Sequence, residues 1–73
     1  MNMGPVYEME TIGKNLRRLR KENHYSVEDI RQYLQLETVQ AVYKYERGRS
    51  LPPAEKLLAL MKLYGAGAEE VAC

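Results

Sequence analysis

The chain has 73 residues, of which 45% are hydrophobic and 29% are charged, and its formal net charge is +1. This length predicts one small domain with one modest core and no room for a separate ligand-binding or dimerisation domain. No apolar run has the length of a membrane span, no signal-peptide pattern is present, and the one cysteine, Cys73, cannot form an internal disulfide. We therefore expect a reduced, cytoplasmic setting.

The charges are unevenly distributed along the chain. Residues 14–49 hold nine lysines and arginines against five acids, whereas the remaining residues hold two bases and five acids. A basic middle segment with acidic flanks suits a domain that has one side facing a nucleic acid.

The first two predicted helices follow from apolar spacing and capping residues. Residues 1–10 show no clean period and are expected to form an arm, which leaves 11–73 as the folded domain. Ile12, Leu16 and Leu19 then recur at helical spacing up to about residue 22. We expect a break at 23–24, because Asn23 tolerates the left-handed conformation that ends helices. Ser26 is a good N-cap for the second helix.

Three further elements complete an all-α chain of four to five helices. The second helix turns Val27, Ile30 and Leu34 inward. A third helix is predicted over about 38–47, ended by Gly48, and a fourth over 53–64, started by proline and ended by glycine. Residues 69–73 are expected to form a last short turn or helix.

The third helix carries two unlike faces. At about 100° per residue, one face is expected to pack against the core and the other to face outward. The inward face holds Thr38, Val42 and Tyr45, and the outward face holds Gln40, Tyr43, Lys44 and Arg47. Glu46 lies about 40° from Val42 on the same wheel. A buried carboxylate needs a partner, and Arg20, at the edge of the first helix's apolar stripe, is the natural one.

These segments together resemble the phage-repressor or Cro-like (XRE-type) helix-turn-helix family. The resemblance covers residues 12–71 and depends on 12–20 in the first helix and 26–30 opening the second. Tyr45-Glu46-Arg47-Gly48 stands where the family usually has Trp-Glu-x-Gly, and Pro52 with 57–60 matches its fourth helix. The chain departs from the pattern at Arg31 and Gln35, where alanine and glycine are usual. It is also one residue longer between Leu36 and Gly48, so we expect an enlarged turn.

The resemblance implies a lambda-repressor-like fold and assigns roles to residues of the third helix. Glutamine pairs with adenine, and lysine can reach guanine O6 and N7. The base-reading positions fall on Gln40, Tyr43, Lys44 and Val39. The phosphate-contacting positions fall on Thr38, Arg47 and Arg49. The family also places a structural ion pair at Arg20 and Glu46.

We therefore expect sequence-specific binding of double-stranded DNA by a homodimeric transcriptional regulator, with the third helix in the major groove. Other hypotheses are an antitoxin-type subunit with a protein partner, a protein-interaction module that has lost DNA binding, and an accessory factor of a mobile element. No histidine–nucleophile arrangement exists, and His24 has no neighbouring histidine or cysteine. We accordingly expect that the chain is not an enzyme and that it binds no metal or cofactor.

Overall fold

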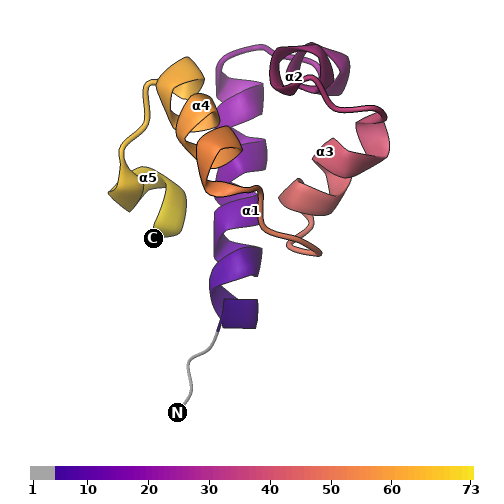
Figure 1. The fold of residues 1–73 in the computed structure, drawn as a ribbon. Coiled ribbons are helices and arrows are strands. Elements are labelled where there is room, and N and C mark those ends of the chain that lie inside the picture. Colours follow the sequence, from indigo (N-terminus) through magenta and orange to yellow (C-terminus); the bar gives the residue numbers. More distant parts are fainter. Residues whose placement is uncertain (1–4) are drawn as a thin grey trace.

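The computed structural model describes residues 5–73, with side chains described from Met9 onward. Within that part of the chain there are five helices and no strand, so the predicted all-α class is confirmed. The helices are α1 (Pro5–Glu22), α2 (Val27–Leu34), α3 (Val39–Glu46), α4 (Ala54–Tyr64) and α5 (Ala68–Ala72). The long helix α1 forms the spine of the molecule, with α4 and α5 on one side and α2 and α3 on the other (Figure 1).

Helix α1 begins earlier than its apolar pattern predicts. Its first residue is Pro5 rather than Thr11, so 5–10 of the expected arm are helical. Proline suits the first turn of a helix, where its missing N–H leaves no bond unmade. The backbone of Glu10 also packs against Gly48, at which a Cβ would lie 2.7 Å from the Glu10 Cα. Contact of Glu10 through its backbone needs no apolar side chain at that position. Residues 1–4 of the expected arm lie outside the described residues.

The link between α1 and α2 differs in one detail from the prediction. His24, rather than Asn23, adopts the left-handed conformation, with φ 63°. The Asn23 side chain instead donates a hydrogen bond to the Leu19 carbonyl at 2.7 Å and caps the end of α1. Ser26 then opens α2 as predicted, because its hydroxyl accepts from the Asp29 N–H while the Asp29 carboxylate accepts from the Ser26 N–H.

The turn between α2 and α3 is built around the two departures from the family pattern. Gln35 has φ 58°, the left-handed conformation for which glycine is the usual residue. Arg31 stands where a small residue is usual, and its guanidinium donates to the Leu36 carbonyl at 2.9 Å. The same guanidinium pairs with Glu28 at 2.7 Å. The long side chain therefore braces the turn that leads into α3.

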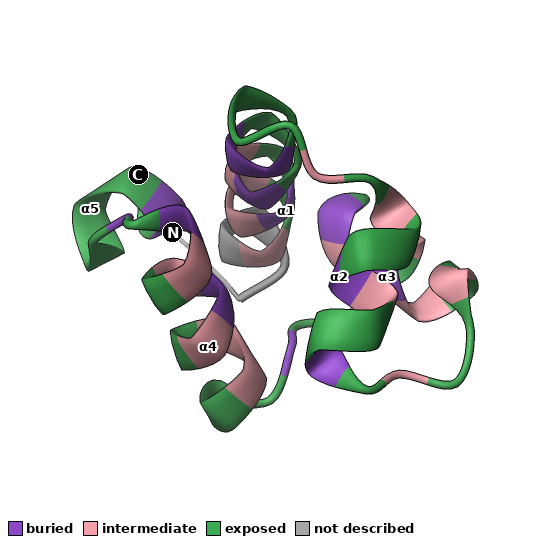
Figure 2. Cartoon of the chain, turned by 90° about the horizontal axis from the view of Figure 1, so that it is seen from above, coloured by how far each residue is buried: buried purple, intermediate pink, exposed green. Residues whose placement is uncertain are grey.

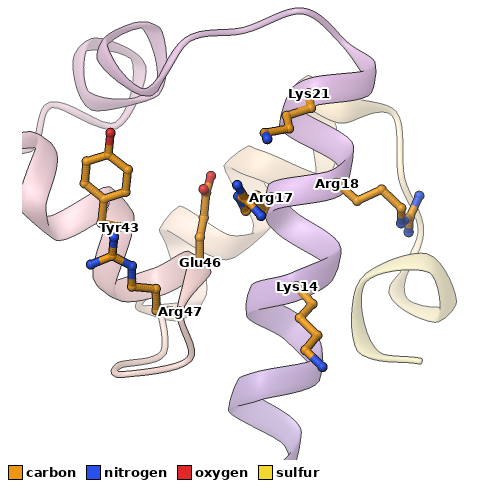
Figure 3. Close-up of a pocket in the computed structure, with 7 residues that line it drawn as sticks. All are labelled: Lys14, Arg17, Arg18, Lys21, Tyr43, Glu46 and Arg47. Carbon is orange, nitrogen blue, oxygen red and sulfur yellow. The ribbon is translucent and has the colours of Figure 1, made fainter.

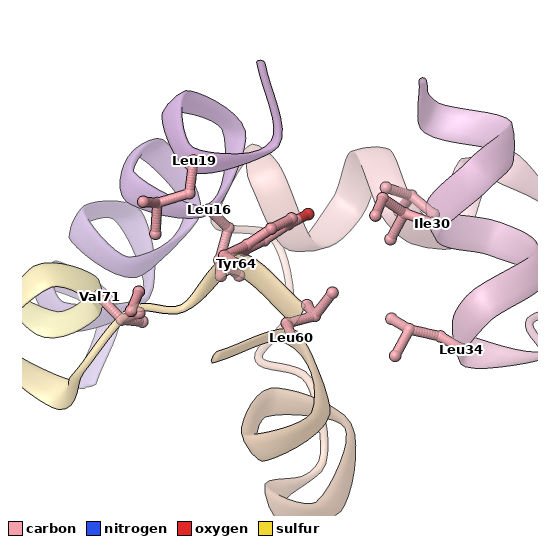
Figure 4. Close-up of a cluster of buried hydrophobic side chains, with 9 residues drawn as sticks. Leu16, Leu19, Ile30, Leu34, Leu60, Tyr64 and Val71 are labelled. Atoms are coloured by element: carbon pink, nitrogen blue, oxygen red, sulfur yellow. The ribbon is translucent and has the colours of Figure 1, made fainter. Parts of the chain in front are cut away.

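The core lies where the helices face one another. Figure 2 shows buried residues on the sides of α1, α2 and α4 that turn toward the middle of the molecule. The buried hydrophobic residues of the core come from all five helices and the link before α5 (Figure 4): Leu16, Leu19, Ile30, Leu34, Val42, Leu60, Tyr64, Ala66 and Val71. Two hydrogen bonds add to this packing. Asn15 donates to the Val71 carbonyl at 2.8 Å, and Tyr33 donates to the Ala59 carbonyl at 3.1 Å.

Candidate nucleic-acid interface

Helix α3 is seated directly on the backbone of α1. A Cβ at Gly13 would lie 2.6 Å from the carbonyl oxygens of both Tyr45 and Glu46. Side chains cannot approach that closely, so only glycine permits this contact between the middle of α1 and the end of α3. The position of α3 is therefore set by backbone packing at its C-terminal end.

The structure brings together Arg20 and Glu46, the two residues expected to pair. Arg20 donates from Nε to Glu46 Oε2 at 2.7 Å and from Nη2 to Oε1 at 3.1 Å. Only 9% and 4% of the two side chains are exposed. Arg20 also donates from Nη1 to the Tyr25 carbonyl at 3.0 Å. The hydrogen bonds to Glu46 raise the pKa of Arg20, against the opposing effect of burial. This two-pronged contact fixes the rotation of α3 about its axis.

Burial also shifts the pKa of Tyr64, an aromatic residue near this pair. Tyr64 of α4 lies in the core, and burial raises the pKa of its hydroxyl well above the ordinary range. Tyr64 packs against Tyr25 with ring centroids 6.3 Å apart. Tyr64 therefore belongs to the core, and Tyr25 is half-buried beside it.

The residues expected to read bases lie on or beside the outward face of α3. Gln40 and Lys44 are exposed, one helical turn apart, whereas Val39 and Tyr43 are half-buried at the flanks. Thr38, expected on the inward face, is exposed. That expectation was wrong because Thr38 is the N-cap of α3, with extended backbone (φ −141°, ψ 157°), so the helical wheel does not apply to it.

The expected phosphate-contacting residues surround the two ends of α3. Thr38 precedes the helix, and Arg47 and Arg49 follow it, with Gly48 between them at φ 73°. Both arginines are exposed. The Arg47 guanidinium lies over the Tyr43 ring, 5.2 Å from its centroid, which is cation–π geometry. Arg47 is thereby held beside Tyr43 on α3.

A basic groove lies between α1 and α3, beside their contact at Gly13, and its existence was not predicted from the sequence. Its volume is about 600 Å³, and we call it the α1–α3 groove (Figure 3). It is lined by Lys14, Arg17, Arg18, Lys21, Tyr43, Glu46 and Arg47. Its one carboxylate, Glu46, is the residue already paired with Arg20. The spacing of the α1 cations is visible in the sequence, but their position opposite Arg47 depends on the packing of α3 on Gly13.

A helix-turn-helix family model matches residues 11–72, which is most of the chain. The chain belongs to the helix-turn-helix domain family. Among solved structures it is similar to the crystal structure of the DNA-binding domain of BldD, with a TM-score of 0.76 and 24% sequence identity. That match covers 97% of this chain and all of the other. No curated protein sequence matches the chain.

Within this helix-turn-helix domain, α2 is the first helix of the motif and α3 the second, with 35–38 as the turn. The expected XRE-type membership agrees with the family match and with the fold shared with the BldD domain. Over the described residues, no three or more histidines, cysteines and acids come together as a metal site would require. None of the described helices combines the length and apolar character needed to cross a bilayer.

Proposed function

We propose that this helix-turn-helix domain binds double-stranded DNA sequence-specifically, with α3 in the major groove, and regulates transcription. The observation that carries the proposal is the contrast between the two sides of α3. Its inner side is fixed by Val42, by the Arg20–Glu46 pair and by backbone contact at Gly13. Its outer side presents Gln40 and Lys44, whose side chains make no hydrogen bond to the described part of the chain.

The exposed groups have the chemistry that base reading needs. A glutamine amide can donate to and accept from adenine in the major groove, and a lysine ammonium can donate to guanine O6 and N7. A major groove about 12 Å wide admits one helix with its side chains. Val39 can meet a thymine methyl at the start of the helix. Thr38, Arg47 and Arg49 flank this surface, so they would contact phosphates and set the register.

We also place the domain on DNA as a two-fold homodimer. In this class of domains two such helices bind half-sites about 34–36 Å apart on a palindromic duplex. Leu58 on α4 supports a contact between copies, since 63% of this large apolar side chain is exposed in the monomer. A symmetric dimer through α4 would cover it. The BldD domain, whose structure is described as DNA-binding, supports the DNA-binding part of the proposal through the shared fold.

Selection from random duplexes tests the proposal. The protein is bound to a library of random DNA, the bound duplexes are sequenced, and the enriched motif is used for titrations at two salt concentrations. We expect an enriched palindrome, steep loss of affinity with salt, and two protomers per duplex in sedimentation. A library that stays random after several rounds would contradict sequence-specific binding, and one protomer per palindrome would contradict the dimer.

A further inference from the structure

The α1–α3 groove holds more positive charge than the fold uses. Within the residues whose side chains are described there are three ion pairs, and none involves Lys14, Arg17, Lys21 or Arg47. Arg18, the remaining cation of the groove, pairs with Glu22 at 3.3 Å and donates to the Glu70 carbonyl. Figure 3 shows it turned away from α3, toward the C-terminal segment. Four like charges along one groove repel one another, so a structural role does not account for them.

Two of these cations extend from α1 toward α3. In Figure 3 the guanidinium of Arg17 and the ammonium of Lys21 lie on the α3 side of α1, while Lys14 lies farther toward the start of the helix. Both residues are exposed. Arg47 lines the other wall, with its guanidinium over the Tyr43 ring, 5.2 Å from the centroid. The two walls therefore present three cationic groups to the same space.

The groove is continuous with the outward face of α3. At about 100° per residue, Tyr43 and Arg47 lie between Gln40 and the buried Glu46, which faces α1. When a helix occupies a major groove, the sugar–phosphate backbones border it on both sides. The side of α3 that carries Arg47 therefore faces the backbone of one DNA strand. The cations of α1 lie next to that side of α3, farther from the bases.

We propose that the α1–α3 groove binds the phosphate backbone of one DNA strand beside the half-site, through Arg17 and Lys21 of α1 together with Arg47. The ligand is the regularly charged backbone, which carries one phosphate per about 3.4 Å of helix axis on each strand. The row from Lys14 to Lys21 extends about 10.5 Å along α1, long enough to meet more than one phosphate. This inference rests on the proposed binding of DNA by α3 and assigns α1 a part in it.

Counterion release gives the inference a measurable signature. Each phosphate neutralised by a cation adds about 0.9 to the slope of log affinity against log salt. The double variant Arg17→Ala/Lys21→Ala should therefore flatten that slope by about 2 for each bound protomer, equally on the selected palindrome and on a scrambled duplex. Lys56→Ala is the matched control, because Lys56 is a cation on α4 outside the groove and on the opposite side of that helix from Leu58. It should leave the slope unchanged.

Neutral methylphosphonates placed singly along the duplex locate the contact. At the phosphates that the groove binds, the substitution should weaken the parent severalfold and leave the double variant unaffected. A double variant with the slope of Lys56→Ala, on duplexes that the parent binds, would overturn the groove contact and leave the function of α3 standing. A parent that shows no salt-dependent affinity for any duplex would overturn both. Loss of inorganic triphosphate binding in the double variant, with an unchanged duplex slope, would assign the groove to a small anion instead.

Discussion

The buried pair between Arg20 and Glu46 makes a strong prediction about stability. Replacing Glu46 with alanine removes both carboxylate oxygens and leaves the Nε and Nη2 donors of Arg20 without acceptors. The third contact of the guanidinium, to the Tyr25 carbonyl, holds it in place at the edge of the core. The variant therefore keeps a positive charge in a site where only 9% of the arginine side chain is exposed.

The expected cost follows from the two bonds lost. Hydrogen bonds to charged groups contribute about 1.5–3 kcal/mol each, and breaking one side of a buried ion pair costs about 3–5 kcal/mol in total. A domain of 73 residues has a free energy of unfolding of about 4–11 kcal/mol, at about 0.05–0.15 kcal/mol per residue. The substitution thus removes a large share of the stability, and the melting temperature should fall by about 12 °C or more.

Thermal and urea unfolding followed by circular dichroism measure the effect. The double variant Arg20→Met/Glu46→Leu serves as the control, because it removes the stranded charge and fills the space with apolar atoms. It should recover much of the loss seen in Glu46→Ala. A Glu46→Ala protein that melts within a degree or two of the parent would refute the reasoning.

Three further predictions concern local packing and charge. Gly13→Ala should cost about 1–3 kcal/mol, because its Cβ would overlap the Tyr45 carbonyl oxygen, and unfolding that matches the parent would contradict this close contact. Gln35→Gly should stabilise the domain by about 0.5–1 kcal/mol in urea unfolding by relieving a left-handed non-glycine residue, and a lower midpoint would count against that strain. Hydrogen bonds from Arg31, then Gln32, lower the pKa of Glu28 from 4.5 to about 2. The stabilisation from these hydrogen bonds should be full above pH 4.5 and lost as the pH falls toward 2. The melting temperature of Glu28→Gln should therefore decline less steeply over that range than the melting temperature of the parent. Equal declines in the two proteins would exclude this contribution of Glu28.

The helices were predictable where side chains alone decide them. Ser26 and Asp29 indicate the start of α2, and glycines indicate the ends of α3 and α4. Capping could be predicted because it depends on residues that are close together in the sequence. The start of α1 was not predictable, since residues 5–10 show no apolar repeat, and Glu10 packs against Gly48 partly through its backbone. The sequence also did not predict that His24, rather than Asn23, adopts the left-handed conformation. The Asn23 side chain caps α1 by donating to the Leu19 carbonyl instead.

The candidate site also has features that the sequence predicted and features that it did not. The periodicity of α3 separates the buried Val42 and Glu46 from the exposed Gln40 and Lys44, since one helix is a rigid local frame. Thr38 is the residue before the helix and has extended backbone, so the helical periodicity placed it on the wrong face. The α1–α3 groove joins residues about thirty positions apart, so it exists only once α3 is packed on α1.

Base reading by α3 is the central claim, and one comparison tests it most directly. Gln40→Ala is titrated against the selected palindrome and a scrambled duplex at two salt concentrations, beside Arg49→Ala. We predict that Gln40→Ala loses about 1–3 kcal/mol on the palindrome, almost nothing on the scrambled duplex, and relaxes the preference at one base position. Arg49→Ala should weaken both duplexes alike and flatten the salt slope by about one for each bound protomer. Equal losses on both duplexes for Gln40→Ala would show that α3 holds DNA without reading it, which contradicts the account.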